Sequence, residues 1–128
     1  MGKQEPRVYQ VVSDPVELER LRGILTKVAR TRYPRAKVGN ILELRTALGI
    51  TEMLDFNASV SVITAALEAS ERFIEIKKKG ITVGQRVSYP GRGEGVVTLI
   101  TRSGQLVVKF SDRKWSCSPR DAELLAAE

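Results

Sequence analysis

The feature that most constrains the fold is an abrupt change of pattern at the basic run of residues 77–80. Upstream of this run, apolar residues recur every three to four positions, which is the spacing of amphipathic helices. Downstream, short segments rich in β-branched residues are separated by glycine- and proline-containing turns, which is typical of antiparallel strands. In a chain of 128 residues, this change predicts an α+β protein with a helical domain over residues 1–79 and a β domain over residues 80–128.

The first helix has clear signals at both of its ends. Asp14 can accept hydrogen bonds from the free backbone N–H groups of a first turn, and Pro15 suits the first helical position. Leu18 and Leu21 begin an apolar stripe at helical spacing. Pro34 disfavours helical geometry at the residue before it, and we therefore expect the helix to end near residue 31 and residues 33–35 to act as a helix stop.

Two further helices and one strand are expected in the helical part. The second helix is predicted from residue 39 to residue 48, with Gly49 as a left-handed cap. The third begins at Asp55 or Asn57 and runs to about residue 70. From Arg72 the period changes, and residues 72–77 are predicted to form a strand.

Four strands are predicted after the basic run, over residues 85–89, 95–101, 105–111 and 114–117. In the third of them, apolar and more polar residues alternate, as expected for a strand with one buried face. A short helical turn within residues 118–125 should cover one end of the sheet. So many short strands in so small a domain predict a small SH3-like antiparallel β-barrel.

Two partial resemblances to known families accompany these patterns. Residues 83–97 read Val-Gly-Gln-Arg-Val-Ser-Tyr-Pro-Gly-Arg-Gly-Glu-Gly-Val-Val. This segment resembles the opening of the Tudor/SH3-like modules of UvrD-type helicases and CarD-type RNA-polymerase-binding proteins. The resemblance implies a protein-binding rim, here at Tyr89, Arg92 and Trp115, with Arg113 beside it. The helical part, with its expected strand at residues 72–77, resembles a winged helix-turn-helix domain.

A block of positive charge lies between Glu19 and Glu43, where the chain holds seven cationic side chains and no acidic one. Such a field of one sign favours a polyanionic ligand, most simply nucleic acid, although a solvated helix face is the alternative. The third helix is poor in the side chains that read base edges, so we expect contacts to the phosphate backbone. The candidate contact residues are Arg22, Lys27, Arg30, Arg32, Arg35, Lys37, Lys77, Lys78 and Lys79.

The composition argues against several other functions. The chain has no histidine and a single cysteine, Cys117, so no His–Cys zinc site, internal disulfide or histidine-based catalysis is expected. No carboxylate pair suggests an enzyme, and we expect no cofactor and no metal. The longest apolar run is too short to span a bilayer, so we expect a cytoplasmic protein without membrane partners.

Two functions of different classes remain open. The first is a non-enzymatic nucleic-acid-associated factor, with duplex DNA the favoured ligand, that acts in transcription or DNA processing. The second is an adaptor or inhibitor that docks on RNA polymerase or another acidic protein and binds no nucleic acid.

Overall fold

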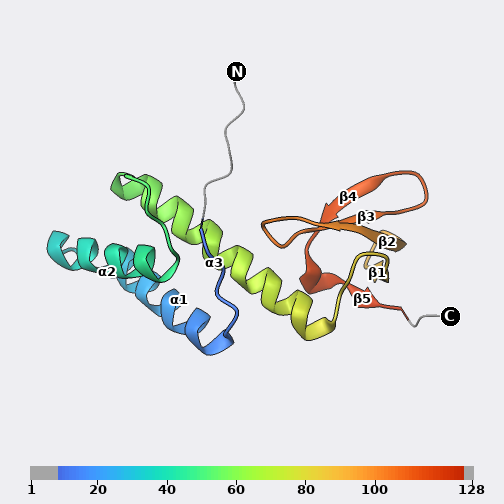
Figure 1. Cartoon of the computed structure of the whole chain (residues 1–128), viewed down its shortest axis with the longest axis horizontal. Helices are drawn as coiled ribbons and strands as arrows, with labels where there is room; N and C mark the ends of the chain where they lie inside the picture. The colour runs from blue at the N-terminus through green and yellow to red at the C-terminus, as the bar shows by residue number, and fades with distance from the viewer. Residues whose placement is uncertain (1–8, 126–128) are drawn as a thin grey trace, which may run out of the picture. The chain divides into compact units, whose positions relative to one another are not determined.

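The computed structural model describes residues 9–125, and within this range three α-helices are followed by a five-stranded antiparallel sheet (Figure 1). This arrangement confirms the predicted α+β class. The chain forms two compact units, one up to residue 68 and one from residue 69 onward, and α3 supplies residues to both. The elements are α1 (Pro15–Arg30), α2 (Pro34–Ala47), α3 (Phe56–Lys79), β1 (Arg86–Tyr89), β2 (Gly93–Ile100), β3 (Leu106–Lys109), β4 (Lys114–Cys117), the 3-10 turn η1 (Pro119–Asp121) and β5 (Glu123–Leu124).

Helix α1 begins and ends as predicted. The Asp14 carboxylate accepts a hydrogen bond from the Val16 backbone N–H at 3.0 Å, and Pro15 occupies the first helical position. The helix ends at Arg30, one residue before the expected position. Its apolar stripe is buried within unit 1, with Leu21 completely inaccessible to solvent. The local capping signals were sufficient here because they act within one turn of the helix.

Helix α2 begins five residues earlier than predicted, at Pro34 rather than residue 39. The expected helix stop at residues 33–35 is therefore wrong in part. Tyr33 is extended, as the residue before a proline should be, but Pro34 itself occupies the first position of the next helix. The early turns of α2 gave no periodic signal because their side chains are mostly exposed, and only Ile41 and Leu44 are buried within the helix.

The strand predicted at residues 72–77 is wrong, because α3 continues through this segment to Lys79. Ile76 is buried in the core of unit 2, and Phe73, three residues before it and on the same helix face, packs against that core. Burial of this face outweighs the preference of β-branched and aromatic residues for strands. The helix ends at Gly80, whose φ of 71° lies in the left-handed region, and the Ile81 N–H bonds the Ile76 carbonyl as in a Schellman cap.

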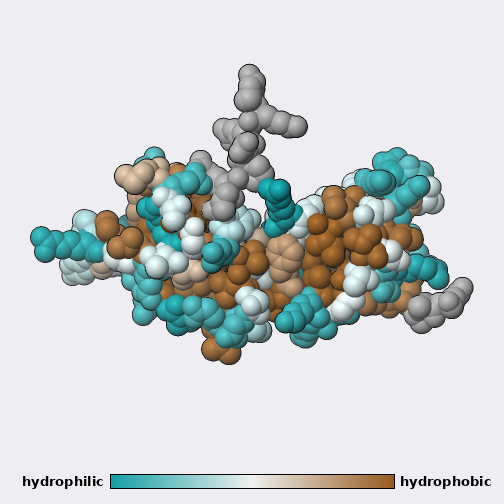
Figure 2. All heavy atoms as spheres, in the orientation of Figure 1, coloured by the Kyte–Doolittle hydropathy of each residue, from teal (hydrophilic) through white to brown (hydrophobic). Residues whose placement is uncertain are grey.

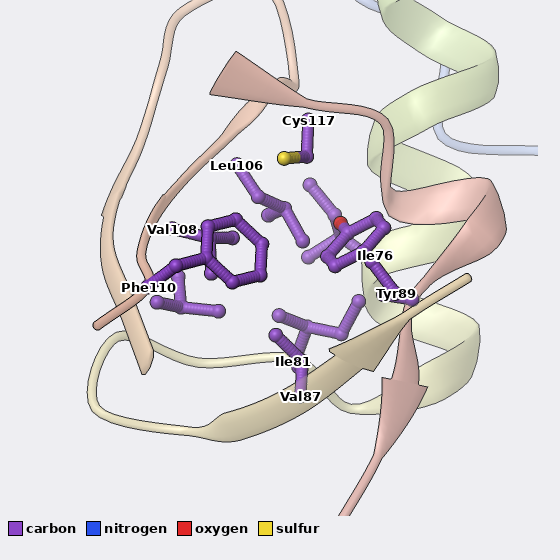
Figure 3. Close-up of a cluster of buried hydrophobic side chains, with 10 residues drawn as sticks. Ile76, Ile81, Val87, Tyr89, Leu106, Val108, Phe110 and Cys117 are labelled. Carbon is purple, nitrogen blue, oxygen red and sulfur yellow. The ribbon is translucent and has the colours of Figure 1, made fainter. Parts of the chain in front are cut away.

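The sheet has the strand order β4-β3-β2-β1-β5, with all neighbours antiparallel. Its inward-facing side chains form one cluster that includes Val87, Val108 and Phe110 (Figure 3). The chain crosses closely over this cluster at Gly95, where a Cβ atom would lie 2.6 Å from Val108 Cγ1 and 2.8 Å from the Lys109 carbonyl oxygen. Only glycine fits this position without displacement of the backbone.

The predicted closed barrel is wrong, because β4 and β5 are the two edges of the sheet and do not pair with each other. The short edge strands explain this: β4 has four residues and β5 has two. Side chains span the gap between β1 and the segment after β4. The Tyr89 hydroxyl donates a hydrogen bond to the Ser118 carbonyl oxygen at 2.7 Å.

Candidate nucleic-acid interface

Four candidate cations gather where α1 ends and α2 begins, and we refer to Arg30, Arg32, Arg35 and Lys37 as the basic corner. The two helices are joined by only three residues, 31–33, so the sequence places these side chains around one tight connection. Arg30, Arg32 and Arg35 are all exposed. Within residues 9–125, no carboxylate lies within ion-pair distance of these three guanidinium groups. The positive charge of the corner is therefore not neutralised within that range.

The start of α2 adds a second source of positive potential. Its first turn contains no acidic residue, and Tyr33 at the N-cap makes no side-chain hydrogen bond to the free N–H groups. The positive end of the helix dipole normally attracts anions, yet Arg35 and Lys37 stand in or next to this turn. The positive end of the α2 dipole thus lies close to two cationic side chains, and a bound anion would relieve the repulsion among them. Figure 2 shows hydrophilic side chains at the end of unit 1 where α2 lies.

Lys37 is held more firmly than the arginines of the corner. It is half-buried, and its Nζ lies 5.7 Å from the centroid of the Phe56 ring, a cation–π distance. Lys37 and Phe56 also line a small, mainly apolar pocket of about 210 Å³, together with Val60. The contact fixes the ammonium group on the α2 side of the corner.

Arg20 belongs to the same basic block of the sequence but is neutralised by the fold. Its Nε donates to Glu17 Oε1 at 2.7 Å and its Nη1 donates to Glu43 Oε2 at 2.9 Å, which links α1 to α2. The hydrogen bond from Arg20 lowers the pKa of Glu17. Arg22, a predicted contact, also lies beside a carboxylate, with Nη1 4.0 Å from Glu19 Oε2. Lys27 is exposed on α1 and remains a candidate.

The three lysines in the last turn of α3, residues 77–79, differ in their exposure and contacts. Lys77 and Lys78 are exposed and remain candidates for phosphate contact. The Lys79 Nζ, in contrast, donates to the carbonyl oxygens of Pro119, Arg120 and Ala122 at 2.9, 2.8 and 2.8 Å. Its Nζ also lies 3.5 Å from Glu75 Oε2. The ammonium group satisfies the backbone of η1, and the predicted phosphate contact of Lys79 would compete with these hydrogen bonds.

The predicted protein-binding rim is only partly assembled. Tyr89 is not on a rim: it is 6% exposed, its ring meets Phe110 edge to face, and burial raises the pKa of its hydroxyl (Figure 3). In contrast, Arg92 and Arg113 both lie near Trp115. Their guanidinium carbons are 4.2 and 5.7 Å from its ring centroid. Trp115 itself is 39% exposed.

Cys117 is buried next to this group. Its Sγ lies 3.7 Å from Arg92 Nη1 and 3.7 Å from the Trp115 carbonyl oxygen. Burial raises its pKa, with Arg92 acting in the opposite direction. A raised pKa disfavours the thiolate, which is the nucleophilic form of cysteine.

Sequence reasoning missed two cations that the sheet register brings together. Lys109 on β3 is directly opposite Lys114 on β4, and both are exposed. The only signal in the sequence is their placement on either side of the Ser111-Asp112 turn, and it becomes informative once the register of the hairpin is known.

Comparison of the chain with protein-family models, with curated proteins and with solved structures finds no match in any of the three. Among the described residues, no helix combines the length and apolar character needed to cross a membrane. The function must therefore be inferred from the geometry and charge of the two basic surfaces, the corner in unit 1 and the hairpin in unit 2.

Proposed function

We propose that this protein is a non-enzymatic accessory factor that binds the phosphate backbone of nucleic acid, with duplex DNA as the favoured ligand, through the basic corner. The observation that carries the proposal is that Arg30, Arg32 and Arg35 lie in or beside the three-residue connection of α1 and α2, exposed and without carboxylate partners in the described part of the chain. Arginine binds phosphate oxygens with two parallel N–H donors, and such contacts supply most of the sequence-independent affinity for DNA.

The outward-facing side chains of α3 favour binding of the nucleic-acid phosphate backbone over recognition of bases. Its outward-facing positions within unit 1 include Ser61, Ala65 and Glu68. These side chains are small or acidic, whereas recognition of bases in the major groove uses mainly Arg, Lys, Asn and Gln. The proposal is therefore a factor with little sequence preference.

We retain part of what the two family resemblances imply. An SH3/Tudor-like relationship for unit 2 is supported by the pattern of residues 83–97 and by the short antiparallel strands around one core. For unit 1 we retain a three-helix nucleic-acid-binding unit. Residues 72–77, from which a first wing strand was expected, belong to α3. Both relationships agree with a role in transcription or DNA processing.

A protein-binding adaptor is the second candidate, and it has one observation in its favour. Tyr33, Val38 and Leu42 are 74%, 63% and 61% exposed. Val38 and Leu42 are four residues apart on one face of α2, next to the cations of the corner. An acidic protein with an apolar patch would fit this surface. Partners captured from a lysate that persist after nuclease treatment, and are lost in Leu42→Ala, would favour the adaptor.

The direct test of the proposed function is the salt dependence of duplex DNA binding by the full chain. With three phosphates neutralised, the logarithm of the association constant should fall with the logarithm of salt concentration with a slope of about −3. Anisotropy of a labelled duplex, measured at several salt concentrations, gives this slope. Binding that is insensitive to salt, or absent at low ionic strength, would contradict the proposal.

The substitution Arg35→Glu should have opposite effects on stability and on binding. A carboxylate in the first turn of α2 interacts favourably with the helix dipole, and unit 1 should gain about 0.5–1 kcal/mol. The same change should lower duplex affinity more than tenfold at about 0.1 M salt, because a phosphate contact becomes a repulsion. Thermal melting by circular dichroism and anisotropy measure the two effects. Arg35→Ala should be intermediate in both, and a variant that loses stability together with affinity would show that Arg35 serves the fold.

A further inference from the structure

The pocket of about 210 Å³ that Lys37 and Phe56 line lies wholly within unit 1 and takes residues from all three helices. Leu25 and Val28 line it from α1, and Phe56 and Val60 line it from α3. The members of each pair are three or four residues apart and therefore lie on one face of their helix. Lys37 lines the pocket from α2. We refer to this site as the apolar pocket.

The volume and the lining of the apolar pocket fit one aromatic ring. An apolar cavity of about 150 Å³ holds benzene, so about 210 Å³ leaves room for a ring with a short substituent. Phe56 can pack against such a ring, since its side chain lines the pocket and is nevertheless 40% exposed. Besides Lys37, only Thr64 among the lining residues has a polar side chain. The lining is therefore suited to a hydrocarbon ring.

The one charged group among the lining residues is the Lys37 ammonium group. Its Nζ lies 5.7 Å from the centroid of the Phe56 ring. Within residues 9–125, no carboxylate lies within ion-pair distance of this ammonium group. A carboxylate on a bound ring would supply the missing counter-ion, and the half-buried position of Lys37 would strengthen the ion pair.

We propose that the apolar pocket binds a small aromatic carboxylate, with the ring between α1 and α3 and the carboxylate on Lys37. Binding sites for small molecules combine a mainly apolar wall with a few polar groups that fix the orientation of the ligand. A side chain of a protein partner fits less well. In a peptide the ring and the negative charge belong to different residues, whereas here one cation lies beside one aromatic wall.

This site goes beyond the proposed function. Lys37 is common to the apolar pocket and the basic corner, but Arg30, Arg32 and Arg35, which carry the proposed function, do not line the pocket. The phosphates of nucleic acid gain nothing from an apolar wall. The two proposals can therefore fail independently.

The experiment uses the full chain, isotopically labelled for two-dimensional amide NMR spectra, with phenylacetate as the probe. Phenylacetate should shift the amide resonances of Val28, Phe56 and Val60 in a saturable manner, with a Kd of about 1 mM. Phenylacetamide has nearly the same size and shape but no charge, and it should bind about fivefold more weakly, as expected for a partly exposed ion pair. Acetate has the charge without the ring and should leave these resonances unshifted at the same concentration.

Two variants test the two parts of the site separately. Lys37→Met removes the ammonium group and retains an apolar stem, so phenylacetate and phenylacetamide should bind this variant with equal affinity. Val60→Phe places a larger side chain in the pocket and should weaken both probes by more than about tenfold. Lys37 and Val60 are only half-buried, so the fold should survive both changes, as circular dichroism can verify.

A short peptide with one phenylalanine among glutamates tests the protein partner as the occupant. It should bind no more tightly than the same peptide with serine in place of the phenylalanine. The proposal is overturned if phenylacetate does not shift the three resonances, if acetate shifts them equally, or if Lys37→Met still prefers phenylacetate to phenylacetamide. Tighter binding of the phenylalanine peptide than of the serine peptide would also overturn it and would assign the pocket to a protein partner.

Discussion

Replacement of Arg30, Arg32 and Arg35 together by alanine should lower the affinity for duplex DNA by about 500-fold at about 0.1 M salt. Each phosphate contact contributes about 0.9 to the salt slope. Relative to 1 M salt, each lost contact therefore lowers the affinity at about 0.1 M salt by about eightfold. The salt slope itself should become less steep by about 2.7, since three phosphate contacts are lost and Lys37 is the only cation of the corner that remains. Anisotropy titrations of wild type and variant across a range of salt measure both quantities. The three side chains are exposed, and the fold should therefore survive the change.

Arg20→Ala is the matched control for this experiment. It removes a positive charge from the same helix, but from a guanidinium group that Glu17 and Glu43 already hold. The variant should lose less than about twofold in duplex affinity and keep the wild-type slope, because a neutralised cation releases no counterion from DNA. Equal losses in Arg20→Ala and in the single variants of the corner would mean that net charge, and not the corner, determines binding.

The second large effect is expected in the stability of unit 2. Lys79→Met should destabilise this unit by about 2 kcal/mol, because it removes a charged donor shared by three backbone carbonyls. A charged hydrogen bond contributes about 1.5–3 kcal/mol, but the Lys79 side chain is 24% exposed and water can replace part of the interaction. Methionine keeps the length and apolar stem of lysine, so the loss reports on the ammonium group and not on packing.

Denaturant unfolding monitored by Trp115 fluorescence follows unit 2 selectively, since the only tryptophan lies in it. Lys78→Met is the control, because it removes the same charge from an exposed neighbour and should change stability by less than about 0.5 kcal/mol. Duplex affinity should be nearly unchanged in Lys79→Met. A loss of affinity with unchanged stability would restore the phosphate contact that the sequence predicted for Lys79.

The features that sequence analysis predicted correctly depend on near neighbours in the chain. The N-terminus of α1 follows from Asp14 and Pro15, which act on the first turn. The strands β1 to β4 lie within a few residues of the predicted segments, because turn residues and alternation of apolar side chains define them locally. The run of cations without intervening acids between Glu19 and Glu43 is likewise a property of the sequence itself, and its role as a binding site stays a prediction.

The predictions that failed depend on packing between distant segments. Residues 72–77 contain β-branched and aromatic side chains, yet they remain helical because Phe73 and Ile76 pack with the sheet core of unit 2. The barrel does not close because the sheet ends in short edge strands that do not pair. Tyr89 is directed into the core and bonds the carbonyl of Ser118, 29 residues later.

The amino-acid sequence by itself determined the α+β class, the limits of α1 and a net charge of +6 concentrated in part between residues 20 and 37. The tertiary structure alone decided which of these charges are available to a ligand. Arg20 is neutralised by Glu43, 23 residues away, and the Lys79 ammonium group donates its hydrogen bonds to carbonyl groups 40 to 43 residues away. Conversely, the pairing of β3 with β4 brings Lys109 and Lys114 together. The physical reason is that electrostatic interactions depend on distance through space, and separation along the chain does not reveal that distance until the fold is known.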